Sequence, residues 1–228
     1  LVAKPFLILT GLSGSGKTKL AEAFASWITE TKKQICMVAV GSDWTNREPL
    51  LGFPNALDNK SYVKPDSGAL DLIINAINNP NLPYFLILDE MNMSYVERYF
   101  ADFLSAMEST NSLISLHSNT EIQDVPSEIH LPKNLFIIGT VNIDETTYMF
   151  SPKVLDRAHV IEFRVNTIEM KNYLDSSNYL NMKVFESDGS FMAQSFLSKS
   201  NEEVENLDGL NSILLKFFEQ LQLVGAEF

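Results

Sequence analysis

The stretch that decides the fold is Gly11-Leu-Ser-Gly-Ser-Gly-Lys-Thr18. It follows Phe6-Leu-Ile-Leu-Thr10, a short apolar run that is typical of a strand buried on both faces. After it, apolar residues recur at helical spacing, which predicts a helix over residues 17–30. A loop of the form G-x-x-x-x-G-K-T between a buried strand and a helix is a P-loop. The alternative is a glycine-rich turn that binds no ligand.

The P-loop pattern predicts a site for the phosphates of a nucleotide. Its glycines allow successive backbone N–H groups to point at phosphate oxygens, and the helix N-terminus adds a partial positive charge. We expect Lys17 to bridge the β- and γ-phosphates and the Thr18 hydroxyl to bind Mg²⁺. The residues predicted to bind the nucleotide are Ser13, Gly14, Ser15, Gly16, Lys17, Thr18 and Lys19.

Further apolar runs predict three more buried strands, at residues 35–40, 84–90 and 135–141, and a fifth strand at residues 160–163. Helical patterns lie between them, at residues 70–77, 94–109 and 152–157. This alternation predicts an α/β fold with a five-stranded parallel sheet sandwiched by helices.

The connecting segments carry weaker patterns. Ser94 followed by Glu97 suggests an N-cap for the helix over residues 94–109. Residues 43–64 predict a long loop or small hairpin, and residues 113–125 predict a hairpin that turns at Ser118-Asn119. Beyond residue 166 the pattern weakens until an amphipathic helix near 210–221.

Two acidic residues and one amide follow predicted strands at the sheet edge where α/β proteins bind ligands. Asp89 and Glu90 end the strand over residues 84–90, and in a chain with a P-loop they read as a Walker B motif. Asp89 is expected to hold the Mg²⁺ shell, and Glu90 to orient and deprotonate the attacking water. Asn142 can hydrogen-bond the γ-phosphate or this water as a sensor. The alternative for Asn142 is a turn residue that satisfies its own backbone.

Arg157 lies between a predicted short helix and the fifth strand. On a single chain we expect it to be a surface cation. If the chain assembles into a ring, this position can present the guanidinium to the γ-phosphate bound by the neighbouring subunit, as an arginine finger.

Composition excludes several classes of protein. With 17 Lys and Arg against 29 Asp and Glu the net charge is −12, which disfavours DNA binding through phosphate neutralisation. Cys36 is the single cysteine, so the chain can form neither an internal disulfide nor a zinc site built from cysteines. The spacing of His117, His130 and His159 does not match that of metal ligands. No apolar run approaches the length of a membrane span, and the first residues show no signal peptide. We expect a cytoplasmic chain that is a piece of a longer protein.

The order and wording of these motifs resemble the AAA+ superfamily, and within it the McrB-type branch, close to MoxR and dynein-related domains. The resemblance covers about residues 5–165 and the helix near 210–225. The stretches that carry it are Gly11-Leu-Ser-Gly-Ser-Gly-Lys-Thr18, Asp43-Trp-Thr-Asn-Arg47 with Leu50-Leu-Gly-Phe53, Leu88-Asp-Glu-Met-Asn92, and Gly139-Thr-Val-Asn142 through Val154-Leu-Asp-Arg157.

The resemblance implies a nucleotide-binding core over residues 1–165, followed by a linker and partial helical lid over residues 166–228. It implies hairpin insertions at residues 52–64 and 113–125, and self-assembly into rings, as hexamers, with Arg157 acting in trans. It also implies a DNA restriction or phage-defence system with a nuclease partner, in which other domains or pore loops contact DNA.

One departure bears on the nucleotide. McrB proper is a GTPase whose sensor strand continues as Met-Asn-Thr-Ala-Asp-Arg-Ser, whereas this chain has Val141-Asn-Ile-Asp-Glu-Thr-Thr147. ATP is therefore the first expectation and GTP the alternative. Two other functions stay open: a MoxR-like or dynein-like module that remodels proteins, and a scaffold that binds nucleotide without hydrolysing it.

Overall fold

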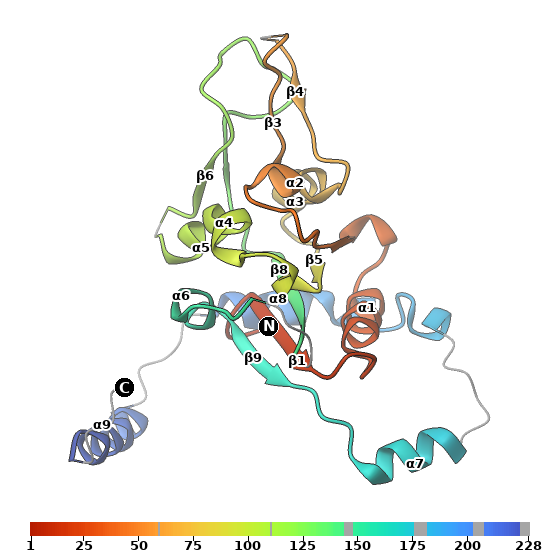
Figure 1. Ribbon diagram of the computed structural model, residues 1–228, viewed down its shortest axis with the longest axis vertical. Helices are drawn as coiled ribbons and strands as arrows, with labels where there is room; N and C mark the ends of the chain where they lie inside the picture. Colours follow the sequence, from red (N-terminus) through yellow and green to blue (C-terminus); the bar gives the residue numbers. More distant parts are fainter. Residues whose placement is uncertain (59, 110, 144–147, 176–181, 203–207, 224–228) are drawn as a thin grey trace.

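The computed structural model describes residues 1–228 except 59, 110, 144–147, 176–181, 203–207 and 224–228. At its centre is an all-parallel sheet of five strands in the order β2-β5-β8-β1-β9, flanked by helices (Figure 1). The strands are β1 (Phe6–Gly11), β2 (Ile35–Ala39), β5 (Tyr84–Asp89), β8 (Leu135–Asn142) and β9 (His159–Glu162). The predicted α/β fold is confirmed, and the architecture is consistent with a P-loop AAA+ core.

Helices connect and cover these strands. The α-helices are α1 (Lys17–Ile28), α2 (Glu48–Leu51), α3 (Ala69–Asn78), α4 (Val96–Tyr99), α5 (Ala101–Glu108), α6 (Pro152–Leu155), α7 (Thr167–Asp175), α8 (Ala193–Asn201) and α9 (Asp208–Leu223). Short 3-10 turns are η1 (Lys32–Gln34), η2 (Met91–Met93), η3 (Met182–Phe185) and η4 (Ser190–Met192).

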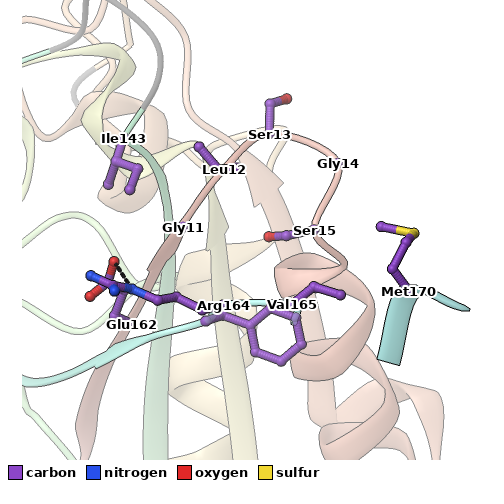
Figure 2. Close-up of a pocket in the computed structure, with 11 residues that line it drawn as sticks. Gly11, Leu12, Ser13, Gly14, Ser15, Ile143, Glu162, Arg164, Val165 and Met170 are labelled. Carbon is purple, nitrogen blue, oxygen red and sulfur yellow. Dashed lines mark hydrogen bonds and ion pairs between the residues drawn. The ribbon is translucent and has the colours of Figure 1, made fainter. Parts of the chain in front are cut away.

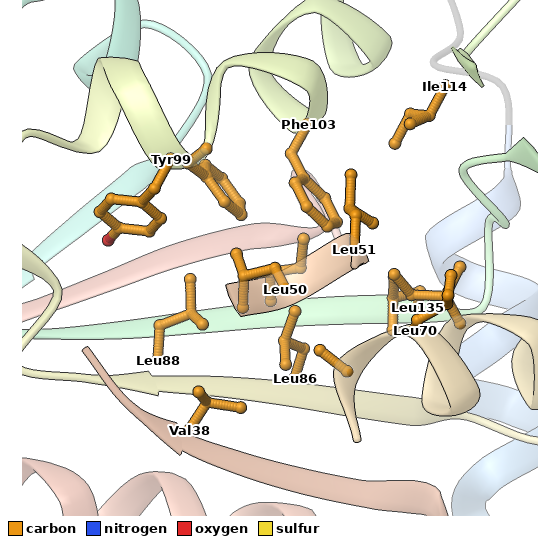
Figure 3. Packing of buried hydrophobic residues seen from close by; sticks show 14 of the residues in the cluster. Val38, Leu50, Leu51, Leu70, Leu86, Leu88, Tyr99, Phe103, Ile114 and Leu135 are labelled. Atoms are coloured by element: carbon orange, nitrogen blue, oxygen red, sulfur yellow. The ribbon is translucent and has the colours of Figure 1, made fainter. Parts of the chain in front are cut away.

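The two faces of the sheet pack into two separate apolar clusters, because successive side chains of a strand point to opposite faces. From β5, Phe85 and Ile87 pack with Ala21 and Ala25 of α1. The alternate residue Leu86 packs in the other cluster, with side chains of α2, α3, α4 and α5 (Figure 3). Because the central strands are buried on both faces, they read in the sequence as continuous apolar runs.

Strand β2 differs from the prediction of a second fully buried strand. It lies at one edge of the sheet and pairs only with β5, from Ile35↔Phe85 to Ala39↔Asp89. Of its five residues only Val38 is buried, and Met37 is 49% exposed. An apolar run alone does not distinguish an edge strand from a central one.

The segment over residues 43–64 forms more structure than the predicted loop. It contains α2 and then a hairpin in which β3 (Phe53–Pro54) pairs with β4 (Tyr62–Val63). Leu50 and Leu51 of α2 are fully buried and join the core on one face of the sheet.

The second hairpin is present, but its predicted pairing is wrong. β6 (Leu113–Ser115) pairs with β7 (Glu128–His130), so the returning strand lies beyond the predicted residues 121–125. Opposite Ile114 lies Ile129, and both side chains are buried. Apolar residues between these strands are buried in the core as well: Leu116, Ile122 and Val125.

The predicted N-cap at Ser94 is also wrong. Helix α4 starts after Tyr95, and the Ser94 hydroxyl donates a hydrogen bond to the carbonyl oxygen of Trp44. The expected single helix is broken at Phe100 into α4 and α5. Glu97 accepts a hydrogen bond from the backbone N–H of Ser151, at the start of α6, with 2.9 Å between N and Oε1.

Both hairpins extend from the same end of the molecule, above α2 to α5 (Figure 1). The rings of Tyr62 in β4 and His117 after β6 lie 5.8 Å apart. Below them, Arg47 joins three segments: its Nη1 donates to Asp102 Oδ2 at 2.7 Å and to the Ser115 carbonyl at 2.6 Å, and its Nη2 to the Leu116 carbonyl. The two insertions are therefore tied to each other and to α5.

Residues after 166 contain more helix than the sequence pattern indicates. Helix α8 packs on the same face of the sheet as α1, where Ala193 and Leu197 are buried and Phe196 lies 4.6 Å from Phe136 between ring centroids. The described side chains of α9 are exposed. The domain boundary at residue 165 stays a prediction.

Gly189 anchors this C-terminal segment on α1. Its backbone N–H donates to the carbonyl of Trp27 at 2.8 Å, and a Cβ at Gly189 would overlap the Trp27 indole. We expect Gly189→Ala to lower the free energy of unfolding by about 1–3 kcal/mol, the usual cost of overpacking. Urea denaturation followed by circular dichroism measures this change.

Gly209→Ala is the matched control, because a Cβ there meets nothing within 4 Å. It lies in α9, where alanine favours helix over glycine by up to about 1 kcal/mol. Equal free energies of unfolding for Gly189→Ala and the wild-type protein would show that the segment does not pack against Trp27.

Candidate nucleotide-binding site

The loop between β1 and α1 has the backbone geometry of a phosphate cradle. Gly14 and Gly16 have φ of +72° and +95°, in the left-handed region where a side chain is unfavourable. A Cβ at either position would meet nothing within 4 Å, so the space in front of the loop is open. Gly16 is the N-cap of α1, so the open side of the loop faces the positive end of a helix.

Lys17 is buried under this loop, with 4% of its surface exposed. Its Nζ donates to the carbonyl oxygens of Gly11 at 2.9 Å and Leu12 at 2.6 Å, and it lies 3.4 Å from Ser15 Oγ. Each of these partners belongs to the loop itself. The Lys17 ammonium therefore lies beside the cradle, where phosphate oxygens could take the place of these two carbonyl oxygens as its hydrogen-bond acceptors.

Asp89 joins the loop to the neighbouring strand ends. Its Oδ1 accepts a hydrogen bond from the Thr18 hydroxyl at 2.6 Å and another from the Thr140 hydroxyl at 2.7 Å. Three elements meet at this one oxygen: α1, the end of β5 and the end of β8.

Glu90 follows at the end of β5 in a left-handed backbone conformation, with φ 53° and ψ 47°. This turn carries its carboxylate toward β8, where Oε1 accepts a hydrogen bond from Asn142 Nδ2 at 3.3 Å. Asn142 is the last residue of β8 and is paired in register with Gly11 of β1. The structure thus brings both predicted carboxylates and the predicted sensor amide beside the loop.

These residues line one cavity of about 260 Å³: Ser13, Gly14, Gly16, Lys17, Thr18, Lys19, Asp89, Glu90, Thr140 and Asn142. Lys19 lies at its rim, with 70% of its side chain exposed, in an ion pair with Glu22 at 2.8 Å. Hydrogen bonding to Glu22 raises the pKa of Lys19.

A second, more apolar cavity of about 480 Å³ adjoins the first (Figure 2). The two cavities share Ser13 and Gly14, and Ser15 lines the second one only. Its remaining lining comes from Gly11 and Leu12 of the loop, from Ile143 after β8, and from residues at or after the end of β9 and in α7: Glu162, Phe163, Arg164, Val165 and Met170. This cavity therefore lies directly beside the loop that is predicted to bind the phosphates.

Arg157 is not part of this cavity and is not the surface cation expected on a single chain. Its side chain is only 15% exposed and forms an ion pair with Glu108. Its Nε also donates to the Leu104 carbonyl at 3.0 Å, which ties the residues after α6 to α5.

The site fits a small, hard cation such as Mg²⁺. Thr18 and Asp89 offer a hydroxyl and a carboxylate oxygen 2.6 Å apart, and oxygen is the ligand type that Mg²⁺ prefers. Within the described residues no group of three or more His, Cys, Asp or Glu could hold a metal by itself. The pair suits Mg²⁺ that keeps waters and phosphate oxygens as its other ligands.

Thr140 is a residue of the site that the sequence analysis did not single out. It is a polar residue inside an otherwise apolar strand, two positions before Asn142, and it is 2% exposed. The sequence shows this polar residue but not the partners of its hydroxyl. Asp144 and Glu145, in the stretch that departs from the McrB signature, lie outside the described residues.

Comparisons with known proteins add little to this geometry. No protein-family model matches the sequence, and no curated protein matches it. Among solved structures, a "putative ATPase" from Cytophaga hutchinsonii ATCC 33406 is similar at 14% sequence identity, with a TM-score of 0.48. The match covers 86% of this chain and 54% of that one, so the chain spans about half the length of its neighbour. Functional assignment therefore depends on the side chains of the site.

In the part of the chain that the structure describes, no helix has both the length and the apolar character needed to cross a lipid bilayer.

The hydrogen bond from Ser151 to Glu97 links α6 to α4, and the pH dependence of stability tests it. Partial burial alone would raise the pKa of Glu97, but hydrogen bonds from Ser151 and from its own backbone outweigh burial and lower it. Because the pKa of Glu97 is lower in the folded than in the unfolded protein, its charged form stabilises the fold at pH values above the unfolded-state pKa. This stabilisation is lost as the pH falls through the folded-state pKa.

We therefore expect Glu97→Gln, which keeps an acceptor but not the charge, to lower the free energy of unfolding at pH 7 by less than about 1 kcal/mol. The difference from wild type should shrink as the pH falls below 4.5, the ordinary value for this group. Urea denaturation at several pH values measures it. A difference that stays constant from pH 7 to below pH 4.5 would contradict the assigned hydrogen bond.

Proposed function

We propose that this chain is the Mg²⁺-dependent nucleoside triphosphate hydrolase domain of an AAA+ motor. The observation that carries the proposal is the meeting of Thr18, Asp89, Glu90 and Asn142 around one cavity in front of a glycine-rich loop. A loop that only binds phosphate would not require a second carboxylate beside the sensor position. A scaffold that binds nucleotide without hydrolysing it is the alternative that the experiments below test.

Each residue has a chemical task in this proposal. The loop N–H groups and Lys17 bind phosphate oxygens, and Lys17 exchanges its carbonyl acceptors for them. Thr18 and Asp89 hold Mg²⁺, which when bound neutralises charge on the β- and γ-phosphates. Glu90 orients a water and accepts its proton, while Asn142 donates a hydrogen bond to the γ-phosphate or to that water.

The apolar cavity beside the loop supports a place for the base. It shares Ser13 and Gly14 with the phosphate cavity and adds the side chains of Phe163 and Met170. We favour ATP over GTP because this chain lacks the signature that follows the sensor strand in McrB proper. Calorimetric titration of each nucleotide into the purified chain measures this preference, and tighter binding of GTP would reverse it.

Glu90→Gln is the central test of catalysis. The amide keeps the size of the side chain but cannot accept a proton, so we expect kcat for ATP to fall by about 10²- to 10⁴-fold while binding is retained. Lys17→Ala is the contrasting variant and should lose nucleotide binding. Phosphate release and calorimetry measure the two quantities. Wild-type turnover in Glu90→Gln would contradict the assigned role of Glu90.

Assembly into a ring, as a hexamer, is the second part of the proposal, with Arg157 acting on the site of a neighbouring subunit. Arg157 lies outside the nucleotide cavity of its own chain, so a direct role in hydrolysis requires a second chain. To reach a neighbour, the guanidinium would have to leave Glu108 and the Leu104 carbonyl.

Mixed subunits test this role. Arg157→Ala and Glu90→Gln should each be inactive alone, with a loss of about 10³- to 10⁵-fold for the arginine, but active when mixed. Glu90→Gln mixed with Lys17→Ala is the control, because those two defects leave no subunit with an intact site. Turnover that stays absent from the first mixture, at concentrations where a ring forms, would contradict action in trans.

The biological setting follows the McrB-like resemblance: a DNA restriction or phage-defence system with a nuclease partner subunit. The net charge of −12 indicates that DNA, if it is the substrate, is held by other domains or by pore loops. The projecting hairpins β3–β4 and β6–β7 are candidates for such loops. A MoxR-like or dynein-like module that remodels proteins is the second candidate, and the partner of the full-length protein distinguishes the two.

A further inference from the structure

The residue Thr140 makes two hydrogen bonds that link both carboxylates of the site. Its hydroxyl lies 2.7 Å from Asp89 Oδ1 and 2.9 Å from the backbone nitrogen of Glu90. The direction of both bonds follows from chemistry: the Glu90 N–H can only donate, and the carboxylate of Asp89 accepts. The hydroxyl therefore accepts from Glu90 and donates to Asp89, which forms a continuous chain of two bonds.

The backbone at Glu90 needs this support. A left-handed conformation is unfavourable for a residue with a side chain, and it persists only where its surroundings hold it. Besides the bond to Thr140, the turn is held by Met91, whose side chain packs over Gly139; a Cβ at Gly139 would lie 2.6 Å from Met91 Sδ. Tyr99 adds a hydrogen bond from its hydroxyl to the Met91 carbonyl at 2.8 Å.

The register of the sheet places Thr140 between the parts that it joins. Leu88 of β5 pairs with Gly139, so Asp89 follows beside Thr140, and Leu9 of β1 pairs with Thr140 on the other side. Asp89 Oδ1 also receives the Thr18 hydroxyl. The carboxylate oxygen of Asp89 that Thr140 holds is therefore the same one that accepts the hydrogen bond from Thr18, the proposed metal-binding hydroxyl.

We propose that Thr140 is a positioning residue whose hydroxyl holds both the carboxylate of Asp89 and the backbone of Glu90 in place. The same hydroxyl therefore supports Mg²⁺ binding through Asp89 and activation of the attacking water through Glu90. This inference rests on the proposed function. Thr140 acts through its hydrogen bonds to Asp89 and to the backbone of Glu90. Partners of metal ligands contribute about 10- to 100-fold to metal affinity or activity.

The experiment compares Thr140→Val, which keeps the shape but removes both hydrogen bonds, with Thr140→Ser, which keeps the hydroxyl. Binding of a non-hydrolysable ATP analogue is measured by calorimetry with and without Mg²⁺, together with kcat, KM and the Mg²⁺ concentration for half-maximal turnover. Thr140→Val should raise that concentration and lower kcat, each by about 10- to 100-fold, and lose most of the Mg²⁺-dependent gain in binding. Binding without Mg²⁺ should stay within about threefold of wild type.

Thr140→Ser should restore Mg²⁺ dependence and turnover to within about threefold of wild type. Thr29→Val is the matched control, since Thr29 is also 2% exposed and its hydroxyl donates to the Ala25 carbonyl at 2.8 Å, at the end of α1 remote from the site. It should lose thermal stability without a change in Mg²⁺ dependence. If Thr140→Val does not fold, Thr140→Ala removes the same two bonds and is judged by the same criteria.

Two results would overturn the inference. Wild-type Mg²⁺ dependence and turnover in folded Thr140→Val would show that the hydroxyl positions nothing, and a Thr140→Ser variant as impaired as Thr140→Val would assign the effect to packing. A wild-type protein whose analogue binding depends on Mg²⁺ but which releases no phosphate would contradict the proposed function alone, because the binding comparison of the variants is unaffected. A protein that binds no nucleotide would overturn both.

Discussion

The interaction on which the site depends is the pair of hydroxyl hydrogen bonds to one oxygen of Asp89. Thr18 brings the start of α1 to this oxygen, and Thr140 brings the end of β8. Neither hydroxyl could reach it unless β1, β5 and β8 ended at the same edge, as parallel strands do. The register of the central strands therefore decides whether the loop, the carboxylates and the sensor amide act as one site.

Burial on both faces holds that register in place. Phe85 and Leu86 of β5 pack into different apolar clusters, so a slip of one residue would move each to the wrong face. The polar side chains of β5 and β8 lie near the ends of the two strands, at Asp89, Thr140 and Asn142. The functional side chains therefore lie at the edge of the sheet, because the middle of each central strand is filled with apolar side chains that pack into the two clusters. Arg47 attaches the insertions to this core, and Gly189 attaches the segment before α8.

The sequence allowed the sheet and most of the candidate site to be predicted, because a P-loop and short apolar runs depend on neighbours in the chain. Gly16 and Lys17 are read from one motif, and Asp89 from the strand before it. Contacts between distant segments could not be read in this way. Arg157 pairs with Glu108, and α8 packs against side chains of β5 and β8, which lie far earlier in the chain. Thr140 was missed because its partners lie on another strand, and one polar residue in an apolar run has no fixed meaning.

A crystal structure of this chain with Mg²⁺ and a non-hydrolysable ATP analogue tests the central claim most directly. The account predicts phosphates in front of residues 13–18, with Mg²⁺ about 2.1 Å from the Thr18 hydroxyl oxygen and Asp89 in its surroundings. It also predicts the base in the cavity lined by Phe163 and Met170. Nucleotide bound elsewhere, or a metal without Thr18 and Asp89 around it, would contradict the claim that these strand ends form a nucleotide site.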